Sequence, residues 1–272
     1  MSFKIGVITE SFRLPLKEAL QKAASLGADG VQIYARNGEL TPDLAQEERK
    51  SLVRYIKDTG LVLSALCGDI GAFDDPETNT DRIRRSKMIV DLAVDMGTSI
   101  VTTHIGTVPE NRQEDKYKII HDACYDLGRY ADLKGVKFAI ETGPEKSHIL
   151  RSLIDDLDCT GIAVNFDPAN LTMCVDDDAR LAVKNLAPYI VHTHAKDGIM
   201  IGKHKNDPRY SDLVGKKKWL ELPLGEGDVI FPTYLAALEK AGYKGFLTIE
   251  REVGDDPVKD IENAVKFLRR LI

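Results

Sequence analysis

Four apolar runs of this sequence each end on a side chain that could bind a metal ion or carry a proton. In chain order these residues are Glu141, Asp167, His194 and Glu250. Carboxylate oxygens and a single imidazole form a ligand set that suits Mn²⁺, Mg²⁺ or Co²⁺, and also Zn²⁺. Three carboxylates that met without a cation would repel one another, whereas a bound dication removes that conflict. Any one of these carboxylates alone is more commonly a helix cap or a solvated loop residue, so the metal-site prediction depends on the whole set.

The residues just before these four follow one alternating pattern. Side chains two residues apart along a strand point to the same face. The residues two positions earlier are small or polar: Ala139, Asn165, His192 and Thr248. The residues directly before the candidates are mostly apolar: Ile140, Phe166, Thr193 and Ile249. The shared phase predicts that the four candidates point to one interior while their neighbours pack outward, with His192 supporting His194 from the layer below.

A repeated order of apolar run, polar turn and amphipathic stretch predicts the elements that position these residues. The expected strands span 5–9, 31–34, 61–66, 99–104, 137–141, 161–167, 189–194 and 245–250. Because each is followed by a helical stretch, the pattern indicates a parallel sheet covered by helices. Eight such units favour a closed (β/α)8 TIM barrel of the α/β class over an open doubly wound sheet. The first strand also lacks the glycine-rich dinucleotide fingerprint typical of many open sheets. No linker is evident, so residues 1–272 are predicted to form one domain.

The barrel prediction places the four candidates at one rim. In parallel barrels the active site lies where the strands have their carboxyl ends. A long polar segment, residues 195–228, separates the seventh strand from the seventh helix and would lie at the same rim. A loop of this length in a compact domain is usually either functional or a sign that its elements have been misassigned. We expect a substrate-covering insertion with a short turn of helix near Trp219, and a merely tolerated surface insertion is the alternative.

Composition narrows the class of protein further. There are 37 Lys and Arg against 43 Asp and Glu, a formal net charge of −6, which argues against a nucleic-acid binder. The cysteines form no CxxC pair, which fits a reducing compartment, or simply buried small residues, better than a disulfide framework. They are Cys67, Cys124, Cys159 and Cys174. We see no signal peptide at the start of the chain and no apolar run of the ~18 residues that a membrane span needs. The sequence therefore predicts a cytoplasmic protein with no membrane or nucleic-acid partner, and it leaves open whether a homo-oligomer forms.

Four segments around the candidate ligands resemble the xylose isomerase-like barrel superfamily. They are residues 140–145, 165–170, 191–197 and 224–227. Within the superfamily, the layout is similar to the sugar phosphate isomerase/epimerase group and to D-tagatose 3-epimerase-type enzymes. The resemblance covers nearly the whole chain and is more specific for the superfamily than for a substrate. It implies that Glu141, Asp167, His194 and Glu250 bind one divalent metal ion, with Mn²⁺ favoured, and that Glu141 and Glu250 act as acid/base groups.

The resemblance implies a metal-dependent isomerase or epimerase acting on a sugar or sugar phosphate. A cation that chelates a carbonyl and a neighbouring hydroxyl acidifies the adjacent C–H and stabilises the enediolate. Two carboxylates on opposite faces can then remove one proton and return another. An inosose-type dehydratase would share the proton abstraction and is the alternative. An abasic-site endonuclease fits less well, because it needs more histidine ligands for a zinc cluster and a basic DNA-facing surface, whereas this chain has six histidines and a net charge of −6. A sugar-binding barrel without catalysis is also considered, and no organic cofactor is expected.

Four further residues are candidates for substrate contacts. His104 ends the fourth strand and could orient a substrate hydroxyl, although a buried structural histidine is equally consistent with the sequence. Asn170 stands where similar epimerases often have a histidine, three residues after the strand-six aspartate. Lys196 could polarise a substrate oxygen or pair with Asp197.

Overall fold

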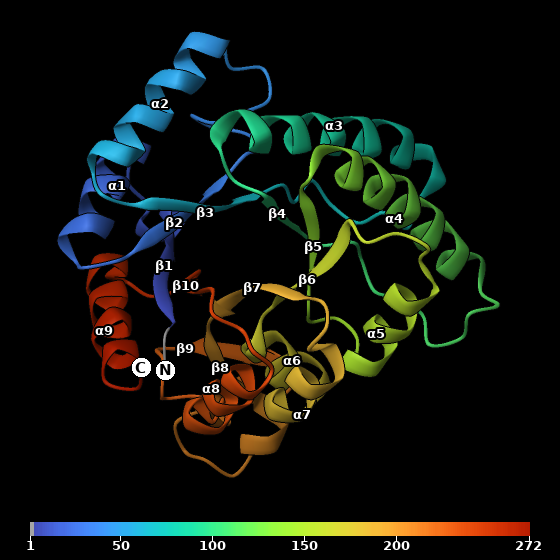
Figure 1. Ribbon diagram of the computed structural model, residues 1–272. Helices are drawn as coiled ribbons and strands as arrows, with labels where there is room; N and C mark the ends of the chain where they lie inside the picture. Colours follow the sequence, from blue (N-terminus) through green and yellow to red (C-terminus); the bar gives the residue numbers. More distant parts are fainter. Residues whose placement is uncertain (1–2) are drawn as a thin grey trace.

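The strands of this protein close into a parallel barrel, as predicted (Figure 1). A computed structural model describes residues 3–272, and the predicted start of the domain at residue 1 lies outside them. Around the barrel the order is β1-β10-β7-β6-β5-β4-β3-β2. The strands are β1 (Lys4–Ile8), β2 (Gly30–Tyr34), β3 (Val62–Cys67), β4 (Ile100–Thr103), β5 (Lys137–Glu141), β6 (Ile162–Phe166), β7 (Ile190–Ala195) and β10 (Phe246–Ile249). The α/β TIM barrel is therefore confirmed.

Helices surround the barrel and bury the outward side chains of the strands (Figure 1). They are α1 (Leu16–Ser25), α2 (Gln46–Asp58), α3 (Pro76–Met96), α4 (Asp115–Lys134), α5 (Ser147–Asp156), α6 (Pro168–Val175), α7 (Ala179–Leu186), α8 (Phe231–Lys240) and α9 (Pro257–Arg269). Phe166 of β6 stacks on Tyr234 of α8 with 5.6 Å between ring centroids, which agrees with the predicted outward phase. The small and polar side chains, which alternate with these apolar ones along the strands, therefore point into the barrel.

Helix α6 was not predicted from the sequence, which suggested a single helix after the sixth strand. Asp167 caps α6 by accepting the N–H of Asn170, and Pro168 occupies the first helical turn, where its missing N–H costs nothing. The helix ends at Asp176, which adopts a left-handed conformation with φ 54°. Two short helices, α6 and α7, therefore follow β6.

In two pairs of neighbouring barrel strands, β2–β3 and β6–β7, the pairing register shifts partway along the strands. Between β2 and β3 the shift lies at Val31 and Gln32, and between β6 and β7 it lies at Val164 and Asn165. Irregular registers of this kind re-aim side chains and are common next to active sites. Gln32 and Asn165 both point into the barrel and contact the same histidine, His194.

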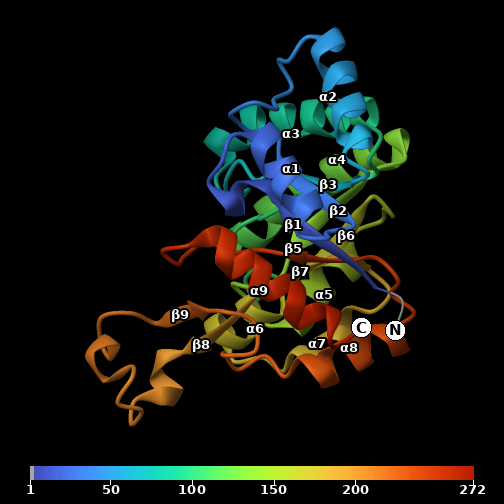
Figure 2. The same ribbon diagram turned by 90° about the vertical axis from the view of Figure 1, so that its left-hand side faces the viewer.

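The long insertion forms an antiparallel hairpin, and its connecting loop holds two short 3-10 turns, Ile201–His204 and Ser211–Leu213, whereas Trp219 itself lies in a strand and not in the expected helical turn. Its strands are β8 (Asp197–Met200) and β9 (Trp219–Leu222). The turn of helix was wrong because Trp219 pairs with Met200 across this hairpin. Figure 2 shows the hairpin and its connecting loop extending from the body of the molecule, on the same side as the β10–α9 connection. In residues 3–272 no helix is long and apolar enough to cross a membrane.

Candidate metal centre

The four predicted ligands meet at the carboxyl end of the barrel. Glu141 ends β5, His194 lies in β7, and Asp167 and Glu250 directly follow β6 and β10. Each offers one ligand atom, and these atoms all lie within 4.8 Å of one another. All four side chains are buried, with Asp167 fully inaccessible and Glu250 8% exposed. The strand phase therefore brings together the residues that the sequence singled out.

Two buried ligand atoms of this group have no hydrogen-bond partner. They are Nδ1 of His194 and Oδ2 of Asp167. The Nδ1 atom lies 3.2 Å from Oε2 of Glu250, 3.5 Å from Oε2 of Glu141 and 3.8 Å from Oδ2 of Asp167. Atoms that share one cation through bonds of about 2.0–2.6 Å have separations of this size. Because unpartnered buried polar atoms are costly, the residues fit a divalent metal ion.

The charges of the four side chains also fit a bound divalent metal ion. Burial would lower the pKa of His194, but Glu141 and Glu250 outweigh it and raise that pKa well above its usual value. Burial raises the pKa of Asp167 despite its contact with His194. The three buried carboxylates are therefore stabilised by a positive charge placed between them. A dication would supply it and leave the His194 nitrogen unprotonated as a ligand.

Two side chains that the sequence analysis did not select orient His194. Its Nε2 lies 3.2 Å from Oε1 of Gln32 and 3.1 Å from Nδ2 of Asn165. Since only Gln32 presents an acceptor, the ring donates Nε2–H to it and keeps the lone pair on Nδ1 for a metal. A glutamine inside an apolar run, between Val31 and Ile33, was the available sequence signal, and the structure buries it fully.

Two amides hold the carboxylate of Glu141. Asn165 donates Nδ2–H to Oε2 over 3.1 Å, and Asn170 donates Nδ2–H to Oε1 over 2.9 Å. Asn170 was predicted to contact substrate, and the structure places it on the first turn of α6 with its amide on Glu141. Asp167 links helix α6 to the candidate ligands, because its Oδ1 caps α6 while its Oδ2 faces the ligand group.

Lys196 lies on the opposite side of the group, beside Glu250. Its Nζ is 3.1 Å from Oε2 of Glu250 and 2.6 Å from Oε2 of Glu252. Burial would raise the pKa of Glu250, but Lys196 and His194 outweigh it and hold that pKa well below the usual value. Glu250 is therefore kept as a carboxylate, the form needed in a metal ligand or a base.

His104 and His192 occupy different levels of the barrel. Nε2 of His104 lies 3.5 Å from Oε1 of Glu141, and its side chain is 42% exposed, so it faces the open end above the ligand group. The carboxylate of Glu141 raises the pKa of His104 to about 9. His192 is buried one layer below His194, with 6.0 Å between ring centroids. Burial lowers its pKa to about 3, so this ring is neutral.

Asp197 holds the insertion in place. It is fully buried, and its carboxylate accepts backbone N–H groups over 2.8–3.1 Å. The donors are Gly198, Gly225, Gly227 and Val229. Every contact that the structure gives this carboxylate is thus with the insertion backbone, and substrate binding by Asp197 stays a prediction.

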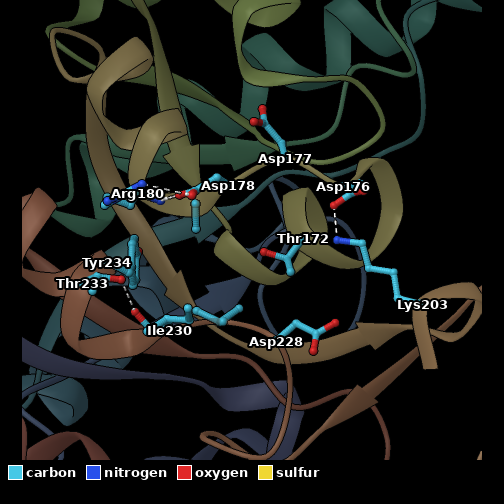
Figure 3. A pocket seen from close by; sticks show the side chains of 12 residues that line it. Thr172, Asp176, Asp177, Asp178, Arg180, Lys203, Asp228, Ile230, Thr233 and Tyr234 are labelled. Carbon is cyan, nitrogen blue, oxygen red and sulfur yellow. Dashed lines mark hydrogen bonds and ion pairs between the residues drawn. The ribbon is translucent and has the colours of Figure 1, made fainter. Parts of the chain in front are cut away.

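Polar contacts also hold the outer part of the insertion beside the barrel. Lys203 pairs with Asp176 in the lining of a cavity of about 480 Å³ between α6, α7, the start of α8 and the insertion (Figure 3). His204 contacts both carboxylate oxygens of Asp228 over 2.9 Å. This cavity is lined by other residues than the four ligands and lies outside the strand barrel.

Residues 20–271 match the family described as xylose isomerase-like TIM barrel. The chain belongs to this family. Among the proteins that the chain resembles is an inosose dehydratase from Clostridium perfringens, 26% identical over an alignment that covers 56% of this chain and 53% of the relative. The chain thus spans about half the length of that curated relative.

Solved structures of other proteins superpose over nearly the whole chain. A xylose isomerase domain protein from Planctomyces limnophilus has a TM-score of 0.81 at 26% identity, covering 99% of this chain and 96% of its own. D-psicose 3-epimerase from Clostridium cellulolyticum H10 has a TM-score of 0.75 at 14% identity, covering 99% of both chains. At that identity the likeness concerns the fold alone.

Proposed function

We propose that this protein is a divalent-metal-dependent isomerase or epimerase that moves a proton next to the carbonyl of a sugar or sugar phosphate. The observation that carries the proposal is the buried group of Glu141, Asp167, His194 and Glu250, with two ligand atoms left unpartnered. Mn²⁺ is the favoured ion, because three carboxylates and one imidazole form a mostly oxygen ligand set. The free cysteines fit a cytoplasmic location.

The residues of the site have separate tasks in this reaction. When bound, the cation would polarise the substrate carbonyl and stabilise the enediolate. Glu250, kept ionised by Lys196, removes the proton from the carbon beside the carbonyl, and Glu141 serves the other face. His104 and Lys196 lie beside Glu141 and Glu250 respectively, where they can hydrogen-bond substrate oxygens.

A dehydratase is the second candidate function. The named inosose dehydratase among the relatives favours it. Such an enzyme would use the same proton abstraction and then expel a hydroxyl from the neighbouring carbon. The two reactions differ in their products, since dehydration loses water and epimerisation preserves the mass of the substrate.

The deciding experiment is a panel of ketoses, ketose phosphates and inososes incubated in D₂O with Mn²⁺. Deuterium incorporation next to the carbonyl, followed by mass spectrometry and NMR, identifies the substrate, and product mass separates epimerase from dehydratase. Absence of exchange and of water loss with every compound would reject both functions.

Glu250→Gln tests the acid/base assignment. We expect deuterium incorporation to fall by about 10²–10⁴-fold, because the amide cannot accept the proton. Glu47→Gln, an exposed change on α2 away from the candidate ligands, is the matched control and should leave exchange unchanged. Exchange at the wild-type rate in Glu250→Gln would show that another group abstracts the proton.

A further inference from the structure

We propose that Asp69 is a positioning residue that keeps a proton on Nδ1 of His104 and thereby presents Nε2 to the substrate beside Glu141. The catalytic part of this inference rests on the proposed function. The orientation of the ring can be tested without it.

Three side chains from neighbouring strands form a continuous row at the mouth of the barrel. Asp69 follows β3, His104 follows β4 and Glu141 ends β5. Oδ2 of Asp69 lies 3.2 Å from Nδ1 of His104, and Nε2 of the same ring lies 3.5 Å from Oε1 of Glu141. The imidazole therefore bridges Asp69 and a predicted metal ligand.

The carboxylate of Asp69 is fixed by the loop that carries it. Its Oδ1 accepts the backbone N–H of Gly71 over 3.0 Å, where Gly71 has a φ of 105° that favours glycine. The backbone carbonyl oxygen of Asp69 accepts a hydrogen bond from Nη1 of Arg36 over 3.3 Å. With Oδ1 held in this turn, Oδ2 is the oxygen that faces His104.

This arrangement determines which ring nitrogen can take part in the reaction. Burial would raise the pKa of Asp69, but the hydrogen bond and charge of His104 outweigh it and lower that pKa, so the group is an acceptor. Nδ1 of His104 must then be the donor, whether the ring is neutral or cationic. Only Nε2 is left to exchange a hydrogen bond or proton with a substrate hydroxyl.

Asp69→Asn reverses this arrangement without removing the turn. The asparagine oxygen is needed by Gly71, so its NH₂ group faces Nδ1 of His104 and turns that nitrogen into an acceptor. In the neutral ring the proton then moves to Nε2. Long-range ¹H–¹⁵N correlation spectra of ¹⁵N-histidine-labelled protein, recorded through the titration of the ring, distinguish the two tautomers.

We expect the Nδ1–H tautomer in the wild type and the Nε2–H tautomer in Asp69→Asn. A wild-type ring protonated on Nε2 would overturn the proposal. This measurement needs no substrate, and the wild-type spectrum alone decides it should the variant not fold.

Kinetics test whether Asp69 acts through His104. We expect Asp69→Asn to lower kcat by about 10–100-fold with little change in KM, and to have no further effect in a His104→Gln background. Asp75→Asn, a cap of α3 in the same connection, is the control for damage to the loop. Additive losses in the double variant would overturn the proposal. If no substrate is turned over by the wild type, the proposed function fails while the spectra still decide the orientation.

Discussion

Gln32 is the side chain through which strand β2 reaches the ligand group. Its Oε1 accepts Nε2–H of His194, and its amide donates to Oγ1 of Thr102 over 3.1 Å. We expect Gln32→Leu to weaken Mn²⁺ binding by about 10–100-fold, because the histidine loses the partner that fixes its tautomer. Isothermal titration calorimetry measures this directly.

The matched control for this prediction is Gln21→Leu, which removes an exposed amide that contacts Tyr55. It should bind Mn²⁺ as the wild type does. Equal affinities for Gln32→Leu and Gln21→Leu would mean that the tautomer of His194 is set in another way.

Glu145 is a buried carboxylic acid outside the ligand group. Burial raises its pKa to about 7 from a usual value of 4.5, although its Oε2 accepts the N–H of Val108 over 3.0 Å. Between these pH values the folded protein binds more protons here than the unfolded chain, so this group makes the free energy of unfolding fall as pH rises. The loss amounts to about 3 kcal/mol.

Glu145→Gln should remove this pH dependence, since the amide oxygen can still accept from Val108. Urea unfolding at about pH 5 and about pH 8 compares the two proteins. The variant should gain stability relative to the wild type at the higher pH. A constant difference between them across this range would contradict the shifted pKa.

At this scale the sequence predicted which candidate ligands would converge, but not the side chains that hold them. The order Glu141, Asp167, His194 and Glu250 follows from strand phase, which a linear pattern records. The roles of Gln32 and Asn165 depend on which strands become neighbours and on their register, and these arise only when the barrel closes. Asn170 likewise contacts Glu141 because of α6, a helix that the pattern did not predict.

At the scale of elements, Asp197 ties the start of the insertion to its end. We expect Asp197→Ala to lower the free energy of unfolding by about 3 kcal/mol, because four backbone N–H groups lose a buried charged acceptor. The hairpin should also become sensitive to trypsin at the lysines of residues 216–218. Urea unfolding and limited proteolysis measure the two effects.

Asp212→Ala, an exposed change in the same insertion, should alter neither measurement. Resistance of Asp197→Ala to trypsin would show that the contacts of β8 with α6 hold the hairpin without the carboxylate.

The eight strand–helix units could be predicted because burial on both faces imposes long apolar runs. The insertion could not. Its strands β8 and β9 are four residues each, and the buried Asp197 and Glu221 lie at the same end of their register, where Asp197 pairs with Leu222 and Gly198 with Glu221. Such pairing depends on contacts outside the hairpin, including the Arg251–Glu221 ion pair at 2.8 Å, which local sequence does not reveal.

At the scale of the whole molecule, metal binding should stabilise the fold. An ion at 100 times its dissociation constant contributes about 2.7 kcal/mol, which raises the Tm of a chain of this size by roughly 5–10 °C. Differential scanning calorimetry with Mn²⁺ and with a chelator checks this. Asp167→Asn should abolish the increase, because its oxygen can still cap α6 while its NH₂ group cannot bind a cation.

A Tm that rises equally in Asp167→Asn would place the ion elsewhere on the acidic surface. The control is Asp178→Asn, whose aspartate caps α7 away from the ligand group. It should retain the full response to Mn²⁺.

The two register shifts limit which insertions and deletions this barrel can accept during evolution. At each shift one strand carries a residue that its neighbour does not match: Ser64 on β3 and Val191 on β7. Deleting either one would invert the side chains on one side of the deletion and move interior groups into the apolar layer. Insertions and deletions can therefore be accepted in the connections between elements. At Ser64 and Val191, by contrast, a residue must be kept at the position, although another residue type can replace it.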